Sequence, residues 1–186
     1  MKRLFFILTT VIVTCGCSTR NPPPPDFQPP KKVLAQNHPF KWNVNEGMLG
    51  VRFGIHSEGV AKYLGQPTER YGQPGQNHSW QYHTLGLLIG FDELDRVVSF
   101  SATDGRGDPN GWLVAFKGVT EKGVQMGSSE KEIIQAYGTP SSIKTYPDGT
   151  LQLLYSSSGY RLVFMLKNGN VNHLTAVRKP ISQNGI

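Results

Sequence analysis

The chain has 186 residues, of which 19 are Lys or Arg and 13 are Asp or Glu, and its net charge at pH 7 is +6. The excess lies near the N-terminus, because residues 46–186 hold 13 basic and 12 acidic side chains, a net charge of +1. Nucleic-acid binding requires a concentrated basic surface on the folded part, so this distribution argues against a nucleic-acid partner. The length of residues 46–180 suits one ordinary domain or two small halves.

The N-terminus has the layout of a signal peptide. Lys2 and Arg3 precede an uncharged, mostly apolar run over residues 4–13, and small residues follow it. The order basic, apolar, small is typical of export signals. This apolar run is about ten residues long, whereas a membrane-spanning helix needs about 20. Residues 1–16 are therefore predicted to be a cleaved signal peptide.

Residues 13–17, Val-Thr-Cys-Gly-Cys, resemble the lipobox of bacterial lipoproteins, with a small residue directly before the modified cysteine. The resemblance implies cleavage before Cys17 and lipid on that residue, although Thr14 stands where leucine is commonest. Two or more acyl chains suffice for stable anchoring. Removal of Cys15 with the signal leaves the mature chain no free thiol for a disulfide or a metal. The alternative is a soluble exported protein with incidental cysteines.

Residues 17–45 are predicted to be a tether. They include the run Asn-Pro-Pro-Pro-Pro-Asp-Phe-Gln-Pro-Pro over residues 21–30. Such a sequence favours extended polyproline II, at about 3.1 Å per residue, and cannot form a core. Ser18 directly after the lipidated cysteine is compatible with sorting to the outer membrane. We expect anchoring at its periplasmic face, or at the cell membrane if the organism has a single membrane.

The rest of the chain matches itself at an offset of 73 residues. Residues 50–98 align without a gap on residues 123–171, with ten identities in 49 positions. The self-similarity predicts a first repeat at 46–103, a linker at 104–122 and a second repeat at 123–180. Coincidence is the alternative, because glycines and aromatic residues dominate the matches.

Each repeat is predicted to hold one short helix followed by three strands. Ser129 and Glu132 have the spacing of a capping box, whereas the first repeat has His56 and Gly59 in these places. Gly65 and Gly138 suit the left-handed residue that ends a helix. The predicted strands are Ser79–His83, Leu85–Phe91 and Val97–Ala102, matched by Leu151–Ser156, Tyr160–Leu166 and Val171–Val177. The predicted fold class is α+β, as two tandem repeats of a helix plus an antiparallel meander.

The second repeat shows the pattern Gly-x-Ser-x-x-Glu, two apolar residues, Tyr-Gly-x-Pro, and then a strand with Tyr155. This pattern resembles the BamE/SmpA/OmlA outer-membrane lipoproteins and the tandem-repeat β-lactamase-inhibitory proteins. The resemblance implies the same helix-plus-meander unit, and protein binding in outer-membrane assembly or maintenance, or in inhibition of an envelope protein. The first repeat departs from the pattern at its helix start.

No residue constellation points to metal or catalytic chemistry. His78 and His83 are the only close histidine pair in the predicted folded part, and a spacing of five on a strand sends them to opposite faces. The loop at 104–111 contains Arg-Gly-Asp and three oxygen-bearing side chains, and we interpret it as a turn between the repeats rather than a calcium loop. No serine occurs in a Gly-x-Ser-x-Gly pattern. We expect no enzyme activity, no cofactor and no metal site.

The candidate partner-binding residues are aromatic. Trp80 and Tyr82 share one face of a predicted strand, and Tyr155 takes the place of Tyr82 in the second repeat. These residues form either the core under the helix or an exposed platform, because alternation does not tell which face is which. Trp112, between the repeats, is a further candidate.

We therefore predict a lipid-anchored, non-enzymatic module that binds another envelope protein, with Cys17 as the lipidated residue. The alternative is a ligand-binding or hydrolytic envelope protein that uses a groove between the repeats. A deep pocket with convergent polar groups would favour the alternative, and an open surface would favour protein binding.

Overall fold

The structure is a computed structural model that describes residues 40–106, 108 and 111–179. Most of the regular structure is β-strand, and the strands form two sheets. Five strands have two or three residues each: β1 Lys41–Asn43, β2 Gly47–Met48, β3 Val51–Arg52, β4 Glu69–Tyr71 and β8 Val119–Thr120. The longer strands are β5 His78–Tyr82, β6 Leu87–Phe91, β7 Val97–Thr103, β9 Ser142–Thr145, β10 Leu151–Ser156, β11 Tyr160–Lys167 and β12 Asn170–Arg178.

The two α-helices have eight residues each, α2 over Ser57–Leu64 and α3 over Glu130–Tyr137. The predicted capping box is confirmed: the Glu132 backbone N–H donates to Ser129 Oγ, and the Ser129 backbone N–H donates to the Glu132 carboxylate. His56 precedes α2 and makes no such side-chain bond. Both helices end at glycines with positive φ. No helix in the described part of the chain has the length and apolar character needed to cross a membrane.

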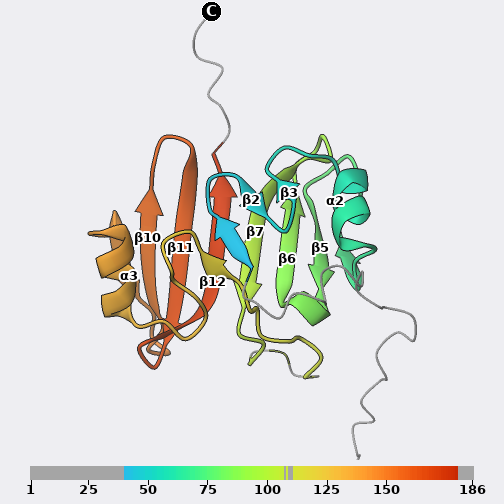
Figure 1. The fold of residues 1–186 in the computed structure, drawn as a ribbon. Helices are drawn as coiled ribbons and strands as arrows, with labels where there is room; N and C mark the ends of the chain where they lie inside the picture. Colours follow the sequence, from blue (N-terminus) through green and yellow to red (C-terminus); the bar gives the residue numbers. More distant parts are fainter. Residues whose placement is uncertain (1–39, 107, 109–110, 180–186) are drawn as a thin grey trace, which may run out of the picture.

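Eight strands form one continuous antiparallel sheet in the order β4-β5-β6-β7-β12-β11-β10-β9. The two halves meet at the centre of this sheet, where β7, the last strand of the first half, pairs with β12, the last strand of the second half. The pairing runs from Thr103 opposite His173 to Ser99 opposite Val177. In the tight turn between β11 and β12, Asn168 and Gly169 both have positive φ, as a two-residue Asn-Gly hairpin turn requires. Figure 1 shows the strands side by side, with α3 near one end of the sheet and α2 near the other.

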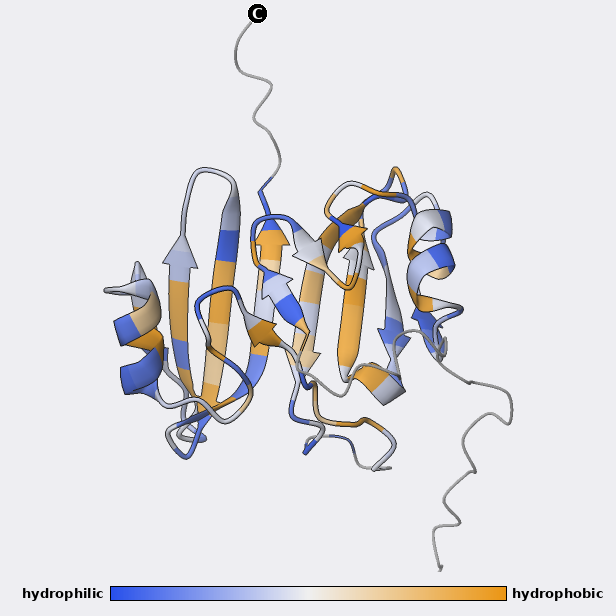
Figure 2. Ribbon diagram, viewed as in Figure 1, coloured by the Kyte–Doolittle hydropathy of each residue, from blue (hydrophilic) through white to orange (hydrophobic). Residues whose placement is uncertain are grey.

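A second sheet of four short strands, in the order β3-β2-β1-β8, lies between the two helices in Figure 1. Trp42 on β1 is fully buried and packs edge-on against Phe100 of the large sheet and Phe116. One face of the large sheet is therefore covered by the helices at its ends and by the small sheet at its middle. The buried hydrophobic residues of β5, β6, β7, β10, β11 and β12 face this layer, and Figure 2 shows the hydrophobic strands and the hydrophilic outer sides of the helices.

The predicted fold class, two tandem α+β repeats that each pack one helix on their own meander, is wrong. The protein is mostly β, and one eight-stranded sheet runs through both halves beside a separate four-stranded sheet. The physical reason is the open edge that a single meander would leave. Pairing of β7 with β12 satisfies the backbone groups along both edges.

Two boundaries also differ from the sequence analysis. Residues 40–45, predicted as tether, contain β1 and the buried Trp42, and the predicted linker at 104–122 contains β8, which pairs in parallel with β1. Elements of the two halves nevertheless begin 73 residues apart, as Ser57 and Glu130 do for the helices. The signal peptide, Cys17 and the proline-rich run lie outside the described residues.

Candidate functional site

The structure buries three of the predicted partner-binding residues. Tyr82 has no exposed surface, and Trp80 and Tyr155 are each 8% exposed. The Tyr82 hydroxyl donates to the Gly65 carbonyl at 3.2 Å, and the Tyr155 hydroxyl donates to the Gly138 carbonyl at 3.0 Å. Burial raises the pKa of both tyrosines above the ordinary value. The two tyrosines therefore fasten the helix ends to the sheet, and all three aromatic residues belong to the core under the helices, the first of the two arrangements considered from the sequence.

Trp112 is the one of the four that keeps partial exposure. Its backbone N–H donates to Asp108 Oδ2 at 2.6 Å, and its ring lies 6.2 Å from the ring of His83. The segment it belongs to continues to Phe116, which is buried against Trp42. Trp112 thus lies on the segment that links the halves, and it does not line the surface hollow between the small sheet and the end of β12.

That hollow consists of two adjoining cavities, of about 510 and 960 Å³, that share Arg52, Phe53 and Arg178 and open to solvent. We call the pair the basic groove. The smaller cavity is also lined by Asn45, Glu46, Gly159 and Tyr160. The larger one is also lined by Gly54, Ile55, Asn77, Asp92, Arg96, Val97, Val98, Val177 and Lys179.

One wall of the basic groove comes from the small sheet. The hairpin of β2 and β3 is closed by the Phe53 backbone N–H, which donates to the Glu46 carbonyl at 2.9 Å. The next residue is tied to the large sheet, because the Gly54 N–H donates to the Val97 carbonyl at 2.8 Å. The ring of Phe53 packs edge-on against Phe100 at 4.9 Å. These contacts fix Phe53 as a half-buried aromatic residue at the base of the groove.

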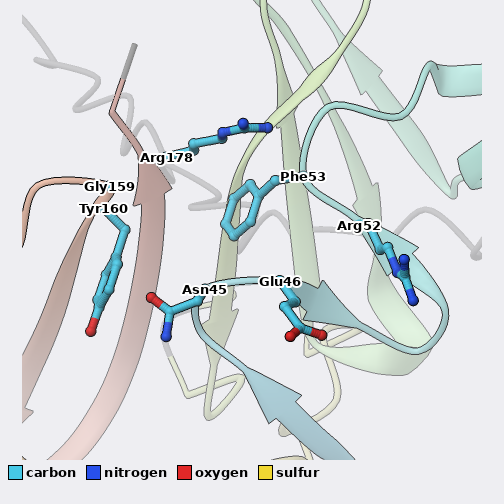
Figure 3. A pocket seen from close by; sticks show the side chains of 7 residues that line it. All are labelled: Asn45, Glu46, Arg52, Phe53, Gly159, Tyr160 and Arg178. Carbon is cyan, nitrogen blue, oxygen red and sulfur yellow. The ribbon is translucent and has the colours of Figure 1, made fainter. Parts of the chain in front are cut away.

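The opposite wall comes from β11 and β12. Tyr160 begins β11 and is the register partner of Arg178 at the end of β12. The Lys179 N–H donates to the Gly159 carbonyl at 2.9 Å and holds these chain ends together. Figure 3 shows Phe53 between Arg178 on one side and Glu46 on the other, with Tyr160 and Asn45 nearby and Arg52 at the far end.

Basic residues outnumber acidic residues among the side chains that line the groove. Four lining residues are basic and two are acidic, which leaves nine basic and ten acidic side chains for the rest of residues 46–186. Arg96 pairs with Asp92 through two contacts of 3.0 and 2.9 Å. Burial acts to raise the pKa of Asp92, but hydrogen bonds from Arg96 prevail and the pKa lies below its ordinary value. The Lys179 ammonium donates to the Ser157 carbonyl.

Arg52 and Arg178 differ from these two cations. Both side chains are exposed, and neither guanidinium has a hydrogen bond or an ion pair with any residue that the structure describes. A guanidinium offers five N–H donors in a planar fork that fits a carboxylate or phosphate. The groove can therefore bind an anionic group at two points without breaking an internal salt bridge.

A smaller cleft of about 290 Å³ lies at the other end of β7, lined by Glu69, Tyr71, Gln81, His83, Thr103, Asp108 and Leu113. The Tyr71 hydroxyl donates to Glu69, and His83 Nε2 lies 3.6 Å from Glu69 Oε1. The hydrogen bond to Glu69, burial, and the charges of Glu69 and Asp108 raise the pKa of Tyr71 to about 12. These polar groups satisfy one another, so the cleft offers an incoming ligand less than the basic groove does.

Sequence reasoning did not find Arg52 or Arg178. They lie far apart in the chain, one in a two-residue strand of the small sheet and the other at the end of β12. No motif connects them, and a net charge of +1 over residues 46–186 hides a local excess. Tyr160 was predicted only as the start of a strand.

No protein-family model and no curated protein matches the chain. Among solved structures it is similar to a DUF4309 family protein (YjgB) from Bacillus subtilis subsp. subtilis str. 168, with 14% identity and a TM-score of 0.49 over 73% of this chain and 88% of that chain. It is also similar to an extracellular protein containing an SCP domain from Bacillus anthracis str. Ames, with 12% identity and a TM-score of 0.45. That match covers 67% of this chain and 43% of that chain, so this chain spans less than half of the second protein. The resemblance to the BamE group stays a prediction.

Proposed function

We propose that this protein is a non-enzymatic cell-envelope lipoprotein, anchored by lipid on Cys17, that binds another envelope protein through the basic groove. The anchor is proposed to lie at the periplasmic face of the outer membrane, or at the cell membrane of an organism with a single membrane. The proposal extends to a role in outer-membrane assembly or maintenance, or in inhibition of an envelope protein.

The observation that carries the binding proposal is the groove itself. Its two cavities share Arg52, Phe53 and Arg178 and remain open to solvent along both parts. An open surface with aromatic residues and arginines suits a polypeptide, since Tyr, Trp, Phe and Arg are enriched where proteins bind partners. A small molecule is more often held in a concave, largely apolar pocket that covers most of its surface.

The side chains that line the groove favour binding over hydrolysis. None of the residues lining either cavity is a serine, threonine, cysteine or histidine. The usual hydrolytic sites place a nucleophile within hydrogen-bond reach of a base, commonly a histidine. The carboxylate of Asp92 in the groove is occupied by Arg96. These features support a binding surface rather than the hydrolytic alternative.

Site-specific photo-crosslinking in intact cells tests the proposal. A photoreactive phenylalanine analogue would replace Tyr160 in the groove, and Tyr146 would be replaced in a matched control. Both residues are partly exposed, but Tyr146 follows β9 at the far edge of the large sheet. We expect a protein adduct from position 160 that position 146 does not give. Identical adducts at both positions, or none at 160, would contradict the proposed surface.

The lipid anchor is tested separately with Cys17→Ser. The variant is expected to lose incorporation of labelled fatty acid and to leave the membrane fraction, because a single acceptor residue carries the acyl chains. Retention of label together with membrane association in high salt would show that the anchor lies elsewhere. This result would leave the crosslinking at Tyr160 unaffected.

A further inference from the structure

We propose that the groove binds an extended acidic segment of the partner, with carboxylates on Arg52 and Arg178 and an apolar side chain on Phe53 between them. This inference rests on the proposed function, because it names the chemistry of the protein segment that enters the same groove. It assigns anion-binding roles to two arginines that the sequence did not distinguish from other surface cations.

The first argument is electrostatic. The groove has an excess of two positive charges, whereas the remaining residues of 46–186 have an excess of one negative charge. Arg96 already has Asp92 as a partner. Arg52 and Arg178 have no ion pair among the described residues, so a carboxylate from outside would supply the missing anions. Hydrogen bonds between charged groups are roughly twice as strong as neutral ones.

The second argument is the position of Arg178 against Gly54. A Cβ built on Gly54 would lie 3.1 Å from Arg178 Nη1, closer than most real side chains approach such an atom. Gly54 also has a φ of +86°. The absence of a side chain at Gly54 therefore lets the guanidinium lie directly over the backbone beside Phe53. Gly127, the corresponding residue of the second half, has the same φ but nothing within 4 Å of its Cβ position.

The third argument is the order of chemical groups along the groove. In Figure 3, Arg178 lies on one side of Phe53 and Arg52 lies beyond its other side. Phe53 is partly exposed and adds aromatic surface between the two cations, and Tyr160, also partly exposed, lies on the opposite wall. An extended chain places residues i, i+2 and i+4 on one face, so the complement of cation, aromatic, cation is an acidic, an apolar and an acidic residue at alternate positions. Both cavities are open to solvent, so such a chain can lie in the groove without being enclosed.

The test uses the purified mature protein in detergent and a fluorescein-labelled peptide, Gly-Ser-Glu-Ser-Leu-Ser-Glu-Ser-Gly. A matched peptide has Gln at each Glu, and anisotropy reports binding at about 50 and about 500 mM salt. We expect only the acidic peptide to bind, and more weakly at high salt. The double variant R52Q/R178Q is expected to bind at least about tenfold more weakly, since two charge-assisted contacts are lost. Arg161→Gln, an equal charge change on the opposite face of the sheet, should bind like the wild type.

A glycine pair supplies the second control. Gly54→Ala and Gly127→Ala introduce the same strain at φ +86°, but only the first displaces Arg178. We expect Gly54→Ala to weaken peptide binding and Gly127→Ala to leave it unchanged. Equal affinities for the Glu and Gln peptides, or an equal loss in both glycine variants, would overturn the inference.

An anionic lipid surface is the other source of negative charge near an anchored protein. Vesicles of phosphatidylglycerol and of phosphatidylcholine therefore form a parallel arm. Binding of the anionic vesicles that depends on Arg52 and Arg178, without any binding of the acidic peptide, would overturn the assignment to a peptide. If the peptide fails while Tyr160 still crosslinks to a protein, the proposed function stands and the acidic-segment inference fails.

Discussion

The N-termini of the two helices meet the same physical requirement in different ways. Each has backbone N–H groups without an intrahelical partner. At α3 the partners are local, since Ser129 and Glu132 exchange hydrogen bonds of 3.3 and 2.6 Å. At α2 the partner is remote: Asp95 Oδ2 accepts from the Ser57 backbone N–H at 3.3 Å and from Ser57 Oγ at 2.7 Å.

Asp95 also connects α2 to the core. Its other carboxylate oxygen lies 3.1 Å from Nε2 of His78, close enough for an ion pair although these two atoms form no hydrogen bond. His78 is buried and stacks on Phe91 at 4.7 Å with an interplanar angle of 8°. The start of α2 thus depends on the turn between β6 and β7, whereas the start of α3 depends on its own first turn. A tertiary contact replaces the local capping box that the first half lacks.

The largest effect is expected from Asp95→Ala. The change leaves the Ser57 N–H without an acceptor and His78 without its carboxylate. Losses of hydrogen bonds to charged groups typically cost about 1.5–3 kcal/mol each, and we expect the free energy of unfolding to fall by about 2–3 kcal/mol. Chemical denaturation measures it. Asp95→Asn, which tolerates the positive φ at this position, is the control and should lose less. A loss smaller than that of Ser129→Ala would contradict the remote cap.

Ser129→Ala should have the next largest effect. Removal of a serine cap typically costs about 1 kcal/mol. We expect the melting temperature to fall by about 2–6 °C for a domain of this size. Differential scanning calorimetry is the measurement. Because Asp95 and Ser129 share no partner, the double variant should show the sum of both losses. Strong non-additivity would mean that the two helix starts are coupled.

Glu132 gives a smaller effect that depends on pH. Hydrogen bonds from the Ser129 backbone and then the Ser129 hydroxyl lower the pKa of Glu132 below its ordinary 4.5. A carboxyl group whose pKa is lower in the folded state than in the unfolded state stabilises the fold fully at pH values above its unfolded-state pKa. This stabilisation is lost as the pH falls through the folded-state pKa. We expect Glu132→Gln to be less stable than the wild type at pH 7, and the difference to shrink as the pH falls below the ordinary pKa of 4.5. A constant difference over this range would show that the charge of Glu132 is not what stabilises α3.

His56→Ala is expected to change least, by no more than about 0.5 kcal/mol. His56 is exposed and its side chain makes no capping bond. His56→Ser should add little, because the Gly59 N–H, the natural target of a serine cap, already donates to the His56 carbonyl at 2.9 Å. Thermal unfolding of both variants beside Ser129→Ala checks the asymmetry. Equal losses for His56→Ala and Ser129→Ala would mean that the two starts are capped alike.

The same contrast explains how much the sequence could predict. Ser129 and Glu132 are three residues apart, so their bond is a local pattern that can be recognised in the sequence. Asp95 and Ser57 are separated by 38 residues, and only the assembled sheet brings them together. Strands of the core alternate buried and partly exposed residues, as in β5, and were predicted. The edge strand β9 is exposed at all four positions and gave no such signal.

Two larger differences between the sequence-based predictions and the structure also arise from contacts between distant parts of the chain. Trp42 has no periodic pattern around it and follows a proline-rich segment, yet it is fully buried between the small sheet and the large sheet. The pairing of β7 with β12 depends on two edges that lie in different halves. Arg52 and Arg178 meet at one groove for the same reason, so the candidate site was missed although its aromatic neighbour Tyr160 lies in a predicted strand.

The most direct test of the basic groove as a binding surface uses the protein that Tyr160 captures by crosslinking. Isothermal titration calorimetry would compare its affinity for the wild type, for Arg178→Gln and for Arg161→Gln. Arg161 is exposed like Arg178 but is not among the residues that line the groove. We expect Arg178→Gln to bind at least about tenfold more weakly, and Arg161→Gln to bind like the wild type. Equal affinities for all three proteins would contradict the account.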